Sequence, residues 1–320
     1  MARPPWYRDS RLKLAVKLAL GALVLAAVGR QGIRAWAQLG SQGRLVRVDW
    51  GWIAASMAGY LGGLLALGLV FSRVMDAGPT PVGRWAAIRA YLVSHLGKYV
   101  PGKALVVVMR VGLVTPYGAR PATAALATLY ETLMMMAAGG LLSAAVGAGP
   151  SFDYGSTIRV PAGLVGLGIG LSLLVVVWPG VFPRLATLAR LPFPGVGPDA
   201  LPRLSGRLLA QGLATSTVGW GLLGLSQVAV LRSIGVTAPL STWPSVVGAV
   251  ALATVAGFVV PIAPGGLGVR EWVLWTTLGA VAPGGLAVVA AILLRLTWLA
   301  AEVLAAVVAL AIRPAVATPC

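Results

Sequence analysis

The chain has 320 residues, of which 58% are hydrophobic and only 10% are charged. A mean hydropathy of +0.88 excludes an ordinary soluble globular protein and leaves no room for a sizeable soluble domain. The formal net charge of +17 comes from 25 Lys and Arg against 8 Asp and Glu. Because these basic residues are scattered over loops, we assign them to membrane orientation and anionic lipid headgroups, and we expect no nucleic-acid partner.

Cysteine and histidine each occur once, as Cys320 and His95. This excludes an intrachain disulfide and any metal site rich in Cys or His. No nucleotide-binding loop, catalytic triad or metal-ligand cluster stands out. We therefore predict a protein that is not an enzyme and that needs no cofactor.

The apolar segments predict an all-α polytopic membrane protein. Residues 12–28 follow a basic N-terminus, and we interpret them as an uncleaved first span rather than a signal peptide. Residues 32–48 mix Arg with apolar side chains and are typical of an amphipathic helix in the interface. Further full spans are predicted over 50–71, 121–146, 160–178, 208–231 and 285–312.

Two further apolar segments, 86–114 and 244–278, are each interrupted by a Pro-Gly pair, Pro101-Gly102 and Pro264-Gly265. Pro removes a backbone donor, and in lipid every freed backbone group must find a partner. Such breaks are usually tolerated where the backbone lines a cavity. Because each break follows plain spans and precedes a long span with an ionisable residue, we predict two repeats, residues 1–148 and 158–313, within one membrane domain over 1–320.

The distribution of basic residues decides how the broken segments cross the membrane. If both are re-entrant hairpins, most Lys and Arg fall on the cytoplasmic side, whereas full crossing divides them almost equally. We therefore predict about six full transmembrane helices plus two re-entrant hairpins, with the second half inverted relative to the first. The protein would lie in the cell membrane with both termini cytoplasmic, although the arginines near residues 30–47 oppose this orientation.

Ionisable residues within membrane segments are costly and usually face a bundle interior or a polar cavity. We predict that Glu131 and Arg295 pair across helices, with a purely structural ion pair as an equally weighted alternative to a ligand-handling role. Arg295 and Glu302 are two helical turns apart and share a face with Trp298. Neighbouring residues on a helix do not face each other, so Arg270 and Glu271 are expected to find separate partners.

Basic residues accompany both breaks. Lys98 and Lys103 flank the first break, with His95 one turn earlier, and Lys103 shares a helix face with Arg110. Helices that start after the breaks would present free N–H groups suited to a phosphate, although His95 alone is more simply a hydrogen-bonded histidine. The candidate headgroup-binding or gating residues are His95, Lys98, Pro101, Gly102, Lys103, Arg110, Glu131, Pro264, Gly265, Gly266, Gly268, Arg270, Glu271, Arg295, Trp298 and Glu302.

The run Tyr-Leu-Val-Ser-His-Leu-Gly-Lys-Tyr-Val-Pro-Gly-Lys at 91–103 and the run Pro-Ile-Ala-Pro-Gly-Gly-Leu-Gly-Val-Arg-Glu at 261–271 suggest a family. Together with Glu131 and Arg295, they resemble the flippase-like transmembrane domain of lysylphosphatidylglycerol synthases. The resemblance covers nearly the whole chain and implies movement of a lipid between leaflets, an aminoacylated phosphatidylglycerol or, as in some relatives, a polyprenyl-linked lipid. The family's synthase activity resides in a separate C-terminal soluble domain, which we expect to be missing because the chain ends soon after Arg313.

Three functions follow from these features. The first is a lipid flippase or translocase whose partners are membrane lipids with anionic or aminoacylated headgroups. The second is a non-transporting accessory or regulatory protein for a lipid- or glycan-modifying enzyme. The third is an ion-coupled transporter of small solutes. The sequence leaves open whether the chain forms a homo-oligomer or binds a lipid-modifying enzyme.

Overall fold

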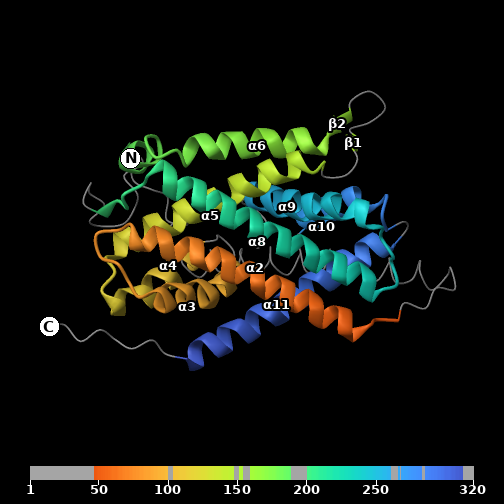
Figure 1. Ribbon diagram of the computed structural model, residues 1–320, viewed down its shortest axis with the longest axis horizontal. Helices are drawn as coiled ribbons and strands as arrows, with labels where there is room; N and C mark the ends of the chain where they lie inside the picture. Colours follow the sequence, from red (N-terminus) through yellow and green to blue (C-terminus); the bar gives the residue numbers. More distant parts are fainter. Residues whose placement is uncertain are drawn as a thin grey trace, which may run out of the picture.

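The computed structural model describes residues 47–99, 104–147, 151–153, 159–188, 200–260, 266, 268–282 and 285–312. Within these ranges it contains ten α-helices, three short 3-10 helices and one pair of short strands (Figure 1). The predicted first span at 12–28, most of the amphipathic segment at 32–48 and both Pro-Gly pairs lie outside the described residues.

The elements follow one another as a run of helices with a single strand pair near the middle of the chain. The helices are α2 (Trp50–Asp76), α3 (Arg84–Ser94), η2 (His95–Tyr99), α4 (Ala104–Val114), η3 (Thr115–Tyr117), α5 (Pro121–Ala145), α6 (Ala162–Val176), α7 (Phe182–Leu188), α8 (Gly206–Ser233), η5 (Leu240–Thr242), α9 (Trp243–Val259), α10 (Val269–Leu278) and α11 (Leu286–Ala311). The strands β1 (Ser151–Asp153) and β2 (Arg159–Pro161) are antiparallel.

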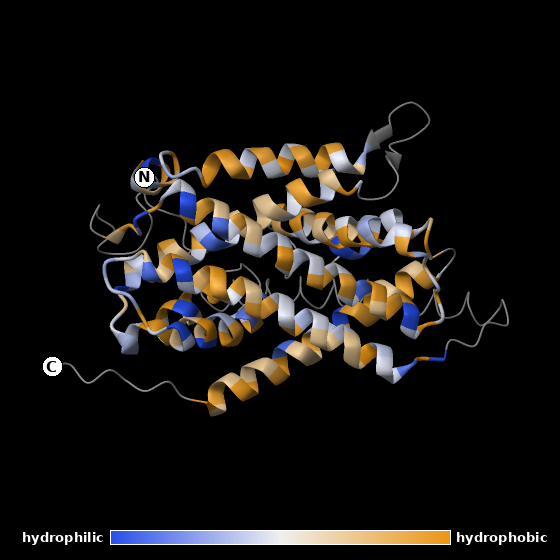
Figure 2. Ribbon diagram, in the orientation of Figure 1, coloured by the Kyte–Doolittle hydropathy of each residue, from blue (hydrophilic) through white to orange (hydrophobic). Residues whose placement is uncertain are grey.

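Among the described residues, five stretches are long and apolar enough to cross a membrane: α2, α5, α8, α11 and the combined segment Leu240–Val259. The prediction of a multi-pass helical membrane protein is confirmed. The predicted span at 160–178 is wrong in length, because α6 has only 15 residues and extends about 22 Å at the usual helical rise. Figure 2 shows that α6 and the C-terminal part of α11 are predominantly hydrophobic.

Local chemistry sets several helix ends. The Asp49 side chain accepts a hydrogen bond from the Gly51 N–H at the start of α2, and Ser205 caps α8 in the same way through Leu208. Arg89 of α3 donates its Nε to the carbonyl of Ala309, in the last turn of α11, over 2.8 Å. A cation at a helix C-terminus satisfies free carbonyls and complements the helix dipole, so α3 fixes the end of α11.

Small residues let the long helices approach closely. A Cβ on Gly140 of α5 would lie 2.8 Å from the backbone of Gly166 and Gly170 in α6. Likewise, a Cβ on Gly63 of α2 would clash with the Leu223 side chain of α8. Close backbone approach is the usual way in which membrane helices pack, because burial of apolar groups gives no advantage inside lipid.

The two interrupted segments pack as helix pairs. Helices α3 and α4 lie against each other toward one end of the long axis of the molecule, and α9 and α10 lie toward the other end (Figure 1). Both pairs are followed by a long apolar helix, α5 in the first half and α11 in the second. This order is the one expected for two inverted hairpins. Because Leu240–Val259 is itself long enough to cross a membrane, the re-entrant path and the inverted repeat stay predictions.

Candidate functional site

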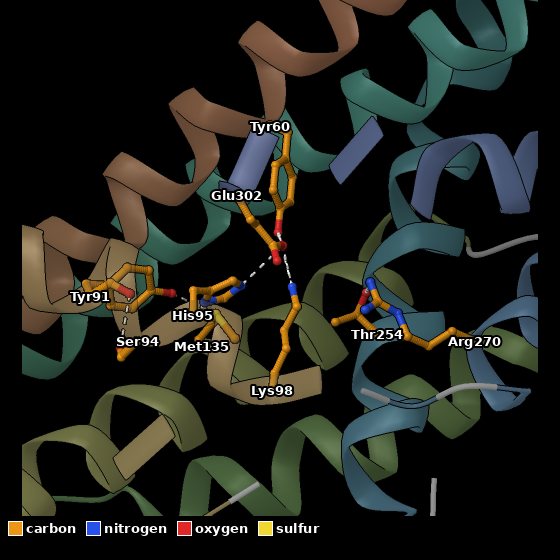
Figure 3. A network of polar contacts seen from close by, with 9 residues as sticks. All are labelled: Tyr60, Tyr91, Ser94, His95, Lys98, Met135, Thr254, Arg270 and Glu302. Carbon is orange, nitrogen blue, oxygen red and sulfur yellow. Dashed lines mark hydrogen bonds and ion pairs between the residues drawn. The ribbon is translucent and has the colours of Figure 1, made fainter. Parts of the chain in front are cut away.

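A buried carboxylate, Glu302 of α11, lies at the centre of a polar cluster inside the bundle. Its Oε1 accepts hydrogen bonds from the Tyr60 hydroxyl of α2 and from Lys98 Nζ of η2. His95 Nε2 lies 3.8 Å from the same oxygen. Figure 3 shows His95 and Lys98 directed at this carboxylate from the first interrupted segment. Over the described ranges, Glu302 Oε2 has no hydrogen-bond partner.

Tyr60 also joins this cluster to Trp298. The Tyr60 and Trp298 rings stack with centroids 4.4 Å apart. Trp298 lies on α11, one helical turn before Glu302. Trp298 Nε1 donates to Ser226 Oγ of α8 over 2.9 Å, and Ser226 is hydrogen-bonded to Ser56 of α2. The predicted common face of Trp298 and Glu302 is therefore held against α2 and α8.

The start of α10 organises the second part of the site. Gly268 precedes the helix with φ 84°, a left-handed conformation that favours glycine, and its N–H donates to Glu271 Oε2 over 2.6 Å. The other oxygen of Glu271 pairs with Arg295 Nη1. Arg270 instead donates to Thr254 of α9, and its guanidinium lies 5.2 Å from the Trp298 ring centroid. The expectation that Arg270 and Glu271 find separate partners is correct.

A small pocket opens between these groups, with about 330 Å³ of space including its open mouth. Three basic side chains face a single lining carboxylate, so the lining carries a positive charge. The lining residues are Lys98, Tyr99, Arg270, Glu271, Leu274, Ala291, Leu294, Arg295 and Trp298. Both interrupted segments contribute, η2 with Lys98 and α10 with Arg270.

A second buried ion pair lies apart from the pocket lining. Arg110 of α4 donates Nη1 to Glu131 of α5 over 2.8 Å and Nε to Ser94 over 3.0 Å. Its guanidinium is also held 4.3 Å from the Tyr91 ring centroid and 4.8 Å from that of Phe71. The predicted pair between Glu131 and Arg295 is wrong. Because α4 packs against α5, Glu131 meets Arg110 within its own half of the chain, while Arg295 is engaged by Glu271.

Several candidates have no described position, and several site residues were missed. Pro101, Gly102, Lys103, Pro264 and Gly265 lie outside the described residues, whereas Gly266 is described with φ 72°. The missed residues are Tyr60, Tyr99, Thr254 and Ser226. Tyr99 adjoins Lys98 in the first motif and could have been included. The other three are polar residues within apolar helices, and nothing beside them in the sequence marks them.

No group of three or more His, Cys, Asp or Glu side chains close enough to hold a metal ion occurs within the described part of the chain. This part offers instead a set of basic side chains held by hydrogen bonds and ion pairs around a pocket. Such a lining can bind an anion, because its basic side chains can form charge-assisted hydrogen bonds to the anion in place of their internal partners.

A bundle of apolar helices with a positively lined pocket, built partly from interrupted segments, defines a polytopic membrane protein with an internal polar site. The family model for the lysylphosphatidylglycerol synthase TM region matches residues 14–306, and the chain belongs to this family. The resemblance drawn from the two Pro-Gly motifs is thereby confirmed. The comparison with curated proteins gave no match.

Proposed function

We propose that this protein moves a lipid with an anionic or aminoacylated headgroup between the two leaflets of the cell membrane. The observation that supports this proposal best is the pocket between η2, α10 and α11, where Lys98, Arg270 and Arg295 face the same space. Arginine and lysine are the side chains best suited to phosphate, because their hydrogen bonds to it are charge-assisted. Membership of the lysylphosphatidylglycerol synthase TM family agrees with a lipid ligand.

The faces of α10 support a lipid rather than a soluble ligand. Glu271 and Leu274 line the pocket, whereas Trp272 and Trp275 are 43% and 48% exposed on the outer face. On α11, Leu296 is 58% exposed beside Arg295. Apolar side chains thus flank the polar pocket on the outside of the bundle. A headgroup would occupy the pocket while its acyl chains stay in the surrounding lipid.

The cations of the pocket already hold internal partners, and this suggests how a headgroup would pass. Lys98 is paired with Glu302, and Arg295 is paired with Glu271. A phosphate entering the pocket would compete with these carboxylates for Lys98 and Arg295. When the phosphate leaves, the two ion pairs would form again. Lys103 and the predicted helix N-termini after the Pro-Gly pairs would complete the site.

The proposal is tested with purified protein in proteoliposomes that contain a fluorescent phosphatidylglycerol. The fraction of this lipid in each leaflet is measured over time by chemical quenching of the outer leaflet. We expect the wild-type protein to accelerate exchange, and Arg270→Gln and Lys98→Gln to slow it at least tenfold. Arg73→Gln is the matched control, because Arg73 is exposed at the end of α2 and its side chain hydrogen-bonds only to Thr215 among the described residues.

The same experiment separates the alternatives. Equal exchange by wild type and by both pocket variants would overturn the assignment of the site. An accessory role would be favoured if the wild-type protein alone moves no lipid and lipid exchange begins only when a lipid-modifying enzyme is added. Uptake of a soluble solute without lipid exchange would favour an ion-coupled solute transporter.

A further inference from the structure

Arg232, in the last turn of α8, is held between two tryptophan rings. Its guanidinium carbon lies 5.0 Å from the Trp52 ring centroid on α2 and 5.2 Å from the Trp243 ring centroid on α9. Trp243 is fixed in turn by donation of its Nε1 to the Ala238 carbonyl. Three helices thus meet around one cation, and stacking on both rings holds the guanidinium in place.

This cation has no counter-ion among the residues that the structure describes. Arg232 Nε is buried without a hydrogen-bond partner. The two terminal nitrogens also have no described partner, but they are not among the buried atoms, so they face accessible space. Asp49 lies close by in the fold, because its backbone N–H bonds to the carbonyl of Ser233, the residue after Arg232. Its carboxylate, however, accepts from Gly51 and caps α2.

The surroundings of Arg232 are those of a membrane–water boundary. Trp50 is 74% exposed, Trp52 is 38% exposed and Leu240 is 71% exposed, and all three lie at the ends of the helices that meet here. Exposed tryptophans at the ends of membrane helices usually lie at the level of the lipid headgroups. The phosphates of phospholipids are therefore the anions closest to the terminal nitrogens of Arg232.

We propose that Arg232, Trp52 and Trp243 form a binding site for the phosphate of a phospholipid, separate from the pocket of the proposed translocation path. The planar guanidinium offers two parallel N–H donors that match two phosphate oxygens, and the indoles fix its plane. None of these three residues lines the pocket, whose lining comes from η2, α10 and α11. The site does not depend on whether the protein moves lipid.

The site is tested by native mass spectrometry of the full chain, titrated with phosphatidylglycerol after delipidation. We expect Arg232→Gln to weaken one lipid-binding event by about fivefold or more, the loss typical of one basic residue near an anionic surface. Arg232→Lys keeps the charge but loses the planar fork, so it should retain only part of the affinity. Arg73→Gln, at the opposite end of α2, is the control and should bind as wild type does.

Four results would overturn the proposal. The first is equal phosphatidylglycerol binding by wild type, Arg232→Gln and Arg232→Lys. The second is equal binding of diacylglycerol, which lacks the phosphate, because the acyl chains alone would then be recognised. The third is complete competition by millimolar glycerol 3-phosphate, which would make a soluble phosphate the ligand. Loss of the binding event in Arg270→Gln but not in Arg232→Gln would assign the lipid to the pocket instead.

Discussion

Lys98 of η2 donates to Glu302 of α11 although 204 residues separate the two in the chain. The Glu302 side chain is fully buried, whereas Lys98 keeps one-fifth of its side-chain surface exposed. The pair therefore joins the first interrupted segment to the last helix at the edge of the pocket. Tyr60 shares the same carboxylate oxygen and adds α2 to the junction.

Glu302→Gln should destabilise the protein by about 1–3 kcal/mol, because Lys98 would lose its counter-ion within the bundle. This loss is below the roughly 3–5 kcal/mol for fully buried pairs, since Lys98 is partly exposed. Thermal unfolding in detergent measures the change. The double variant Lys98→Met with Glu302→Gln should recover part of it, because it leaves no unpaired charge. Strictly additive losses would contradict the pairing.

A double-mutant cycle distinguishes the two possible partners of Glu131. We expect a coupling energy of about 1–3 kcal/mol between Arg110→Met and Glu131→Gln, because they remove the two ends of one buried ion pair. The cycle of Glu131→Gln with Arg295→Met should show coupling below about 0.5 kcal/mol, since these residues have different partners. Unfolding free energies of the variants give both values. Strong coupling in the second cycle would restore the cross-helix pair of Glu131 and Arg295 that the sequence predicts.

Gly140→Ala should destabilise the contact between α5 and α6 by about 1–3 kcal/mol through overpacking. The new Cβ would lie 2.8 Å from the backbone of Gly166 and Gly170, which cannot move away as a flexible side chain can. Gly168→Ala is the matched control, because nothing lies within 4 Å of its Cβ and alanine favours a helix. A comparison of melting temperatures checks the pair, and equal effects of the two substitutions would refute the packing.

Gly257→Ala should slow lipid exchange without removing any polar group. Its Cβ would lie 2.6 Å from Arg270 Cγ and 3.2 Å from Gly266 Cα, so the Arg270 side chain would have to leave its place over Trp298. The proteoliposome assay measures the effect, for which we expect at least a threefold loss. Gly221→Ala, on an open face of α8, should exchange lipid as wild type does. Unchanged exchange by Gly257→Ala would show that the position of Arg270 is unimportant.

The position of each interrupted segment could be read from the sequence because its signal is local. A Pro-Gly pair in the middle of an apolar segment disfavours a continuous helix there, and His95, Lys98, Arg270 and Glu271 lie within a few residues of such a pair. The separate partners of Arg270 and Glu271 also follow from helix geometry alone. By contrast, nothing near Tyr60 or Ser226 in the chain distinguishes them from other polar residues in apolar helices.

Hydropathy by itself determined that this chain is a multi-pass helical membrane protein, because the thickness of a bilayer demands long apolar segments. The two motifs determined its family, because their residue types and spacing are local and specific. Only the tertiary structure decided the partners of the charged groups. Glu131 could meet any cation brought to it, and the packing of α4 against α5 brings Arg110 rather than Arg295. Which charges meet in a membrane protein depends on which helices pack together, and the pattern of apolar residues does not encode this.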